Sequence, residues 1–440
     1  MNLISSYAVQ LTHVDFDLKP TIHIYRTALS YCIDVVNNEW SNVITVKSAK
    51  EKVNFVEHLI HSTKDNVAKY DFDNRFYKMP SYLRRAVIQS AIGSVSSYKS
   101  SLENWNKNHN GKEPTLALDR YAMPVFYNKN MYLTSDNPYE GYLKVYFNND
   151  WVWRKVSLLP TDVKYLQKHL SHLTPSAPVL EKRFGTYYLR FAFEENVQLY
   201  NTPIRNQTIC AVDLGLNTDA VCSIMTADGT IHARKFINFA SDKDHLLHVV
   251  NRIKKQQRKH GNKSIKSRWR YAKHINEQLS VKIATAIVDF AELYNADVVV
   301  FEYLDIKGKV RTCKAQMLQL WRKNEIQNIA THKTHKRHMR VSHICAWGTS
   351  KLAFDGSGNV IRDKNNYALA TFTNGKQYNC DLSASYNIGS RYFIRELLKP
   401  YSATDRSQLW AKVPTAKRRT TCTYTTLVAF HKAEIELGFI

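Results

Sequence analysis

Three short stretches set the architecture of this chain: Ala211-Val212-Asp213-Leu214-Gly215, Val299-Val300-Phe301-Glu302 and Cys380-Asp381-Leu382-Ser383. The first two read as buried strands, because each is a continuous apolar run that ends in an acid. The third reads as the start of a helix, where the helix dipole favours a carboxylate and any cation bound to it. Two strands and one helix would therefore present three acids, Asp213, Glu302 and Asp381, to a common site.

Three carboxylates in such a setting suit divalent cations. Mg²⁺ takes hard oxygen ligands and retains waters, so a few carboxylates suffice to hold it. Two ions about 4 Å apart would activate a water and stabilise the leaving oxygen of a phosphodiester. We expect Asp213, Glu302 and Asp381 to be catalytic residues and ligands of two Mg²⁺ ions, with Mn²⁺ as a substitute.

The alternative is that the three acids are surface-facing strand ends, since a motif of this kind also arises by chance. The other acids of the region lack the same setting: Asp228 and Asp355 are typical turn residues, and Asp219, Asp289 and Asp305 do not end strands.

The composition indicates which class of partner the chain binds. The chain has 440 residues, is 44% hydrophobic and carries 62 Lys plus Arg against 38 Asp plus Glu, a net charge of +24. Such an excess predicts a polyanionic partner, because neutralising phosphates releases counterions. No apolar run approaches the roughly 18 residues of a membrane span, and the N-terminus does not read as a signal peptide. The seven scattered cysteines suit a reducing cytosol.

The order of expected elements suggests a helical module inserted after the first strand of a small β-barrel or sheet. Strands are expected over 6–12, 121–133, 142–158 and 187–193, with helices over 18–38, from Pro80-Ser81 onward and over 161–173. From residue 207 the pattern is α/β, with a hairpin over 221–236, helices over 243–295 and 313–332, a strand over 297–301, two hairpins over 345–380 and a helix over 381–398.

The residues around the acids resemble the motifs of a known family. Ala-Val-Asp-Leu-Gly-Leu-Asn-Thr at 211–218, Val-Phe-Glu-Tyr-Leu at 300–304 and Asp-Leu-Ser-Ala-Ser-Tyr-Asn-Ile at 381–388 resemble the three RuvC motifs of TnpB nucleases. These nucleases are encoded by bacterial insertion-sequence transposons and are related to the miniature type V CRISPR effectors. Gly348-Thr349-Ser350 is similar to the segment before the family's zinc knuckle, and Pro80-Ser81-Tyr82-Leu83-Arg84-Arg85 to a helix start in its recognition module.

The resemblance implies a fold class of α/β plus β-barrel and helical lobes. An RNase H-like (RuvC) nuclease domain would follow an oligonucleotide-binding-type wedge barrel with an inserted helical recognition module. The barrel would take residues 1–14 and 116–203, the recognition lobe 15–115, and the nuclease domain 204–440. An insert at 341–380, a degenerate zinc ribbon, would bind target nucleic acid.

The same resemblance implies an RNA-guided DNA endonuclease with a single active site. Its partners would be a guide RNA and target DNA, with the guide bound by basic helices and the barrel. We expect a cytoplasmic, prokaryotic protein that associates with the nucleoid when bound to its target; the sequence leaves its oligomeric state open, with a monomer favoured over an oligomer. The sequence leaves open whether the guide comes from a transposon end or a CRISPR array.

Three other functions stay open. A non-cleaving RNA-guided DNA-binding regulator would be expected to lose an acid, and this chain keeps three. A transposase of an insertion sequence would place Glu last, whereas the order here is Asp, Glu, Asp. An RNA-binding scaffold would show no metal-dependent loss of DNA.

The zinc pattern of the family is incomplete here. The family carries C-x-x-C twice between its second and third motifs, a strong zinc signal. Only Cys345 and Cys380 stand in that region, and His343 does not complete a tetrahedral set. We expect no zinc, with hairpin packing in its place and Trp347 in the core.

Basic residues without balancing acids form a second pattern. Residues 251–274 hold ten Lys or Arg and no acid, a run that would repel itself unless a polyanion lay alongside. Around His332, His335, His338 and His343, the positive charge opposes a bound cation. A solvated face is the plain alternative to nucleic-acid contact. The expected contacts are Lys254, Lys255, Arg258, Lys259, Lys263, Lys266, Arg268, Arg270, Lys273, Lys333, Lys336, Arg337 and Arg340.

Overall fold

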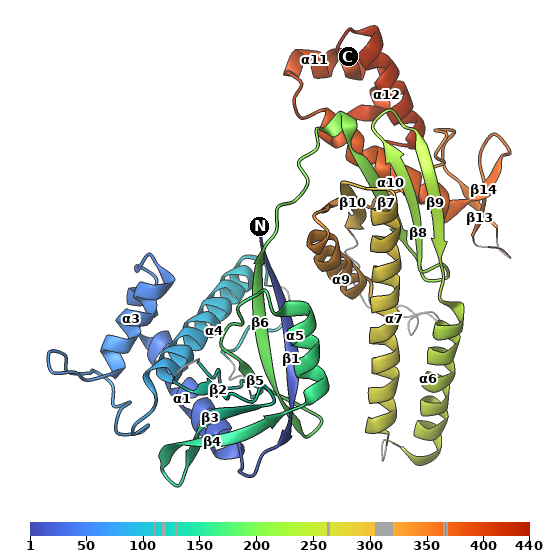
Figure 1. The fold of residues 1–440 in the computed structure, drawn as a ribbon. Coiled ribbons are helices and arrows are strands. Elements are labelled where there is room, and N and C mark those ends of the chain that lie inside the picture. The colour runs from blue at the N-terminus through green and yellow to red at the C-terminus, as the bar shows by residue number, and fades with distance from the viewer. Residues whose placement is uncertain are drawn as a thin grey trace. The chain divides into compact units, whose positions relative to one another are not determined.

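The computed structural model forms two compact units, one of residues Asn2–Glu195 and one of Met1 with Asn196–Ile440 (Figure 1). It describes residues 1–109, 111–116, 120–127, 130–261, 265–303, 320–363, 366 and 368–440, the side chain of His260 excepted.

Helices of the first unit pack on one another through apolar stripes. Pro20 stands in the first turn of α1, where a missing N–H costs nothing, and Ser48 caps α3 through a capping box with Glu51. Helices α1 and α4 lie against each other in one core. The helices of this unit are α1 Lys19–Asn38, α2 Trp40–Val43, α3 Ala49–Ile60, α4 Ser81–Asn108 and α5 Pro160–Leu170.

The sheet of the first unit is open. Its strand order is β2-β3-β4-β1-β6-β5, and within the described residues no ladder joins the edge strands β2 and β5. The barrel expected from the sequence is therefore not closed here. Strand β5 escaped prediction because Glu181-Lys182-Arg183 masks its alternation. The strands are β1 Asn2–His13, β2 Tyr132–Thr134, β3 Glu140–Phe147, β4 Asp150–Leu158, β5 Val179–Arg183 and β6 Thr186–Asn196.

The second unit is built on a five-stranded sheet with the order β11-β10-β7-β8-β9. Strands β7, β8 and β9 form an antiparallel meander, and β10 and β11 add in parallel to β7. This agrees with the expected α/β organisation. The strands are β7 Thr208–Leu214, β8 Ala220–Thr226, β9 Ile231–Ile237, β10 Val298–Tyr303 and β11 Arg340–Cys345.

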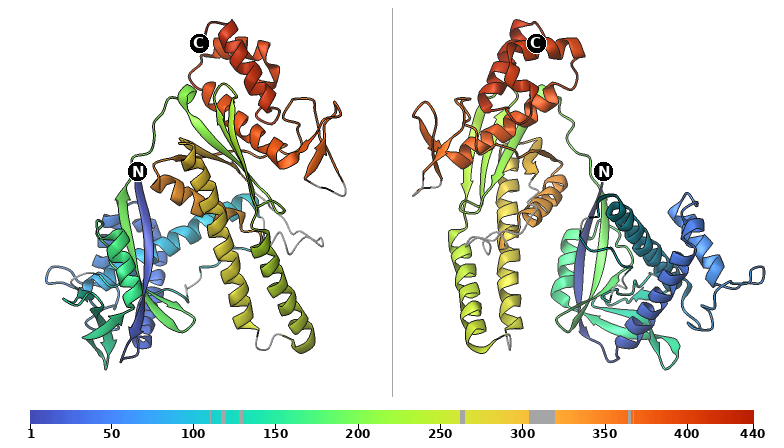
Figure 2. Two further views of the ribbon diagram at one scale, coloured as in Figure 1. Left: turned by 45° about the vertical axis from the view of Figure 1, so that its right-hand side comes forward. Right: turned by 180° about the vertical axis from the view of Figure 1, so that it is seen from behind.

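Helices cover both faces of that sheet (Figure 2). Helix α7, Lys266–Leu293, and α9, Lys323–Lys336, share a core with the side chains of one face, including Val212 and Phe301. On the other face, α10, Cys380–Leu397, and α12, Tyr424–Glu436, share a core with Ala211 and Val300. Each strand therefore supplies alternate side chains to two different cores, as a sheet buried on both faces requires.

Helix α6, Ala240–His260, runs side by side with α7 and extends with it beyond the sheet (Figures 1 and 2). The two helices have a small core of their own, formed by Leu246, Val250, Ile253 and Ala272. The hairpin therefore holds together where the sheet no longer supports it.

The predicted insert holds a small three-stranded sheet of β12 Ile361–Arg362, β13 Leu369–Thr371 and β14 Gln377–Asn379. Strand β11 was not anticipated, and it puts residues 341–345 of the predicted insert into the main sheet. The remaining elements are η1 Ile204–Asn206, α11 Ala403–Lys412 and η2 Pro414–Lys417. Among the helices of the described residues, none has the length and apolar character needed to cross a membrane.

Helix α10 lies unusually close to the sheet at Gly389. An ideal Cβ there would lie 2.1 Å from Met225 Sδ and 3.2 Å from Ala211 Cβ. We expect Gly389→Ala to lower the free energy of unfolding by about 1–3 kcal/mol through overpacking, as urea unfolding would measure.

The matched control is Gly93→Ala in α4, where an ideal Cβ meets nothing within 4 Å. That change should be neutral or raise the free energy of unfolding by up to about 1 kcal/mol, because alanine favours a helix interior. Equal stabilities for the two variants would show that α10 does not lie this close to β7 and β8.

Candidate active site and basic surfaces

Asp213 and Glu302 lie side by side because of strand alternation and register. Ile209 and Ala211 of β7 face the α10 core, as do Val298 and Val300 of β10. Side chains two residues apart share a face of a strand, so Asp213 and Glu302 continue the same two rows. Val212 pairs with Phe301 in a parallel ladder. The two acids therefore follow at the same end of neighbouring strands.

Asp381 joins them from the first turn of α10. The cap residue Asn379 accepts a hydrogen bond of 2.9 Å from the backbone N–H of Leu382, which fixes where the helix begins. Cys380 Sγ donates to Asp381 Oδ1 at 3.4 Å. The three predicted acids, although far apart in sequence, thus converge on one region of the second unit.

The pKa of the Asp213 carboxyl group reflects the closeness of the other two acids. Burial raises the pKa of Asp213 well above its usual range, and the charges of Glu302 and Asp381 raise it further. The positive charge of Arg362 opposes the rise. An ionised Asp213 is therefore costly here unless a cation lies nearby.

Glu302 is also buried, and it has an unused oxygen. Burial raises its pKa, against a hydrogen bond with Thr349 and the charge of Arg391. Its Oε1 atom is buried without a hydrogen-bond partner. A buried acceptor left unpaired costs free energy, and a cation ligated by that oxygen would remove the cost.

The residues present fit a hard divalent cation on these grounds. Among the described residues, no group of three or more His, Cys, Asp or Glu side chains already has the spacing that holds one ion. Mg²⁺ is commonly held by only one or two carboxylates together with waters and substrate phosphates. The unpaired oxygen of Glu302 and the crowded charge around Asp213 are the features that favour it.

Two polar residues of α10, Asn387 and Arg391, form hydrogen bonds with the chain segments around the helix. The sequence analysis did not single them out as site residues. Asn387 Nδ2 donates to the carbonyls of Thr349 and Leu352, both at 2.9 Å, and its Oδ1 accepts from Tyr424 N at 3.0 Å. This buried amide is therefore well satisfied. It is the one asparagine of the third motif at 381–388, so the motif was a sequence signal for this residue.

Arg391, about one turn further along α10, has a similar role. Its guanidinium donates to four carbonyls, those of Cys345, Trp347, Thr420 and Cys422, at 2.8 to 3.2 Å. Hydrogen bonds thus hold the chain after β11 against α10.

The prediction that Trp347 lies in the core is wrong. Its side chain is 72% exposed, with the Lys351 ammonium 5.8 Å from its ring centroid. The core below it is formed by Ala353, Ala370, Phe372 and Cys380, whereas Cys345 is exposed. Trp347 precedes a turn at Gly348, and the sequence around such a turn does not show whether a hydrophobic side chain points into the core or toward solvent.

The predicted basic contacts of α6 and α7 lie on the hairpin that extends beyond the sheet. Those of α7 are exposed, and those of α6 are exposed or partly so. Lys263 lies outside the described residues. The described members are Lys254, Lys255, Arg258, Lys259, Lys266, Arg268, Arg270 and Lys273.

The predicted basic contacts of α9 and of the residues after it, up to the start of β11, differ in their surroundings. Arg337 forms ion pairs with Asp289 at 2.7 Å and Glu292 at 3.0 Å, which join α9 to α7. Arg340 has its Nε and Nη2 atoms buried without a hydrogen-bond partner. Lys336 is exposed and Lys333 partly so. Arg337 therefore contributes to packing in a way that a charge run does not reveal.

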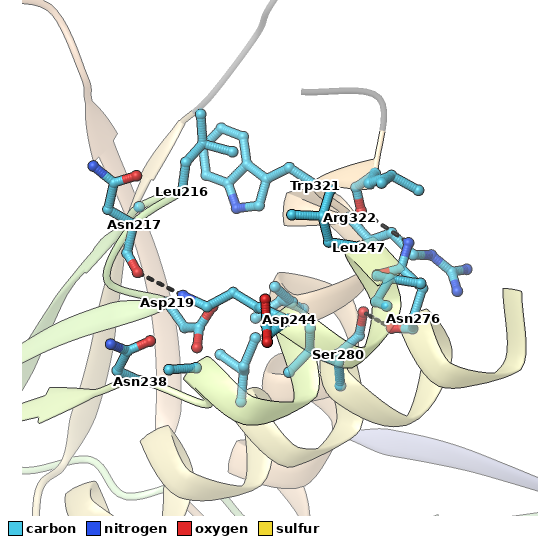
Figure 3. A pocket seen from close by; sticks show the side chains of 18 residues that line it. Leu216, Asn217, Asp219, Asn238, Asp244, Leu247, Asn276, Ser280, Trp321 and Arg322 are labelled. Carbon is cyan, nitrogen blue, oxygen red and sulfur yellow. Dashed lines mark hydrogen bonds and ion pairs between the residues drawn. The ribbon is translucent and has the colours of Figure 1, made fainter. Parts of the chain in front are cut away.

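A cavity of about 380 Å³ lies behind the loop that follows β7, lined by that loop and by α6, α7 and α9 (Figure 3). Asp219 is buried at its edge, accepts from Phe239 N at 2.7 Å and pairs with Lys243 at 3.1 Å. The loop is tight, since a Cβ on Gly215 would lie 2.5 Å from Thr218 O. Asp219 thus stabilises the turn that follows Asp213.

Comparison by sequence finds likeness in the first unit. A family profile described as the Aq_aa04 family matches residues 5–147. The uncharacterized protein aq_aa04 of Aquifex aeolicus (strain VF5) is 30% identical over 128 residues, which cover 27% of this chain and 71% of that protein.

Comparison by structure finds likeness over most of the chain. The mini-RNA-guided endonuclease CRISPR-Cas_phi3 matches with a TM-score of 0.53 and 11% identity, over 91% of this chain and 93% of that one. CasPhi-2 (Cas12j) bound to crRNA and phosphorothioate-DNA gives 0.49 and 10%, over 87% and 90%. Cas12f1 in complex with sgRNA and target DNA gives 0.48 and 14%, over 77% and 73%. At these identities the first likeness shows a shared fold.

The crowded carboxylates predict an unusual dependence of stability on pH. The pKa of Asp213 is raised above its unfolded value near 3.8. Its contribution to stability is therefore fully present below that value and is lost as pH rises through the folded pKa. In a chelator, Asp213→Asn should be more stable than the unaltered chain at neutral pH, as thermal unfolding would measure.

Asp228→Asn is the control of opposite sign. Although partial burial works against it, hydrogen bonds with Thr226 and Thr230 hold the pKa of Asp228 at about 2. That carboxylate contributes stability above its unfolded pKa, so its removal should lower stability at neutral pH. A loss of stability in both variants would contradict the crowding of charge around Asp213.

Proposed function

This chain belongs to the Aq_aa04 family, and we propose that it is an RNA-guided DNA endonuclease with one metal-dependent RuvC-like active site. The finer assignment, to the TnpB-like kind encoded by transposons, rests on the motif resemblance at 211–218, 300–304 and 381–388. The family match itself carries no activity, since its relative is uncharacterized.

The observation that carries the proposal is the convergence of three acids from two parallel strand ends and a helix start, with one buried oxygen of Glu302 left unpaired. Two further observations support it. The chain has a net charge of +24, and its fold is like that of a protein described as a mini-RNA-guided endonuclease.

In this proposal Asp213, Glu302 and Asp381 hold two Mg²⁺ ions. Bound Mg²⁺ supplies a water nucleophile at neutral pH and charge stabilisation for the leaving oxygen of the phosphodiester. The chain orients the three acids through the β7–β10 register, the cap of α10 and the hydrogen bond of 2.9 Å from Gln327 Nε2 to the Glu302 carbonyl. Rigid placement of this kind lowers the cost of orienting charged groups during reaction.

Nucleic acid is proposed to lie along the α6–α7 hairpin. The exposed Lys and Arg side chains there would contact phosphates of a guide RNA or target DNA. Such contacts position a strand without reading its sequence, so sequence recognition is left to guide pairing.

Substitution of an acid tests the activity. Asp213→Ala removes one proposed metal ligand and should reduce DNA cleavage by more than about 100-fold. Loss of a residue that only hydrogen-bonds to a metal ligand already reduces activity by up to about 100-fold, and loss of the ligand itself should reduce it further. The protein would be expressed with its native flanking DNA, the copurifying RNA sequenced, and cleavage of a matching DNA measured.

Asp228→Asn is the matched control, because that carboxylate lies in the β8–β9 turn and belongs to no predicted ligand set. It should keep cleavage, and both variants should keep the RNA. Full cleavage by Asp213→Ala would refute the proposal. Joining of cleaved ends would favour a transposase, and guided DNA binding without cleavage by the unaltered chain would favour the regulator.

Metal binding is testable without activity. A ligand that binds only the folded state stabilises it by about 2.7 kcal/mol at 100 times its dissociation constant. Mg²⁺ should therefore raise the unfolding temperature of the unaltered chain at neutral pH, and Asp213→Asn should lose most of that rise. K⁺ at matched ionic strength is the control for screening. An equal rise in both proteins would place the bound Mg²⁺ elsewhere.

A further inference from the structure

A basic pocket lies at the C-terminal half of α10, in the second unit. It has a volume of about 310 Å³ and lies between α10, α11, η2 and the residues after η2. Asp381 and Arg395 are separated by about 20 Å along α10, at a rise of 1.5 Å per residue. The pocket is thus distinct from the acids. Six basic side chains line it and no acidic one does among the described residues: Arg391, Arg395, Lys399, Arg406, Lys417 and Arg419.

The positive charge of this pocket is poorly balanced. Arg406 donates to the carbonyls of Leu398 and Lys399, both at 2.9 Å, and Arg391 likewise donates only to carbonyls. Carbonyl dipoles satisfy the N–H groups without cancelling the charge. Glu396 contacts Arg395 at 2.9 Å and Lys399 at 2.6 Å, so one carboxylate serves two cations.

The remaining two cations are exposed like Lys399, but they lack the carboxylate partner that Lys399 has in Glu396. Lys417 and Arg419 are exposed, and within the described residues of the chain neither forms an ion pair with a carboxylate. The Lys417 ammonium lies 5.9 Å from the centroid of the Trp410 ring. Two accessible cations thus stand at the pocket beside an aromatic face.

Trp410 supplies an independent sign of a missing partner. Its side chain lines the pocket, and its indole Nε1 is buried without a hydrogen-bond partner. A buried N–H without an acceptor costs free energy. An anion in the pocket would balance the charge, and an anionic oxygen that reached the indole Nε1 would also supply its acceptor.

We propose that this pocket binds a phosphate group of a nucleic-acid strand, as a second binding site apart from the three acids. Arginine forks match phosphate oxygens, lysine adds a point charge, and an indole offers a stacking surface. The class of ligand rests on the proposed function and on the net charge of +24. The pocket would anchor the strand at a fixed distance from the cleavage site.

The test compares two double variants of the full chain that lose equal charge. Lys417→Ala/Arg419→Ala removes the accessible cations of the pocket. Arg418→Ala/Lys432→Ala removes exposed cations of the same unit that do not line it. Binding of end-labelled single-stranded DNA and RNA of one sequence would be followed by fluorescence anisotropy in a chelator, at several salt concentrations.

For the pocket variant, the slope of log affinity against log salt should fall by about 1.4, since each phosphate contact on a single strand contributes about 0.7. The control should change the slope far less. A loss confined to RNA would identify the guide as the ligand, and a loss confined to DNA the target. Equal slopes for the two double variants would overturn the proposal. So would binding of labelled poly-glutamate that the pocket variant loses while it keeps its affinity for DNA and RNA.

Trp410→Phe separates the indole N–H from the ring. It keeps an aromatic face, so it should preserve the unfolding temperature while weakening binding several-fold. Unchanged affinity would overturn the role given to the indole. These readouts need no cleavage: if Asp213→Ala still cut DNA while the pocket variant lost binding, the proposed activity would fail and the pocket would stand.

Discussion

Three like charges share one buried region of this protein, and that constraint governs the second unit. Asp213 and Glu302 reach the region because two parallel strands end together, and Asp381 because a helix starts there. Burial and mutual repulsion raise the pKa of Asp213 well above its usual range. A fold that keeps such a cluster without a cation loses stability at neutral pH, and this cost is the physical basis of the proposed Mg²⁺ site.

Helix α10 is the element through which this constraint is met. Its first turn carries Asp381, Gly389 allows it to approach β7 and β8, and Asn387 and Arg391 tie it to the chain on either side. The chain after β11 is thus held by buried hydrogen bonds. An amide and a guanidinium that saturate several carbonyls give one well-defined arrangement, because any other would leave buried polar groups unpaired.

The positive charge of the chain serves more than one purpose. Arg337 pairs with two acids of α7, and the guanidinium of Arg391 donates its hydrogen bonds to backbone carbonyls. Both side chains therefore stabilise the fold. The basic side chains of the α6–α7 hairpin are exposed or partly exposed, on helices with a small core of their own. The pocket at the end of α10 combines the two kinds, since Arg391 is buried and bonded to carbonyls whereas Lys417 and Arg419 are exposed.

The main strands and helices of the second unit and the three candidate acids could be predicted from the sequence, because continuous apolar runs and helix starts are local patterns. Local patterns misled at Trp347, which is exposed, and at β11, which was missed, while they left a barrel or a sheet open in the first unit, where the strands form an open sheet. The adjacent rows of Asp213 and Glu302 could not be predicted in this way, since strand register depends on pairing between segments that are distant in sequence. The same holds for the arginines that bind acids or carbonyls and those that face solvent. The partner of a long charged side chain is set by tertiary packing and not by its neighbours in sequence.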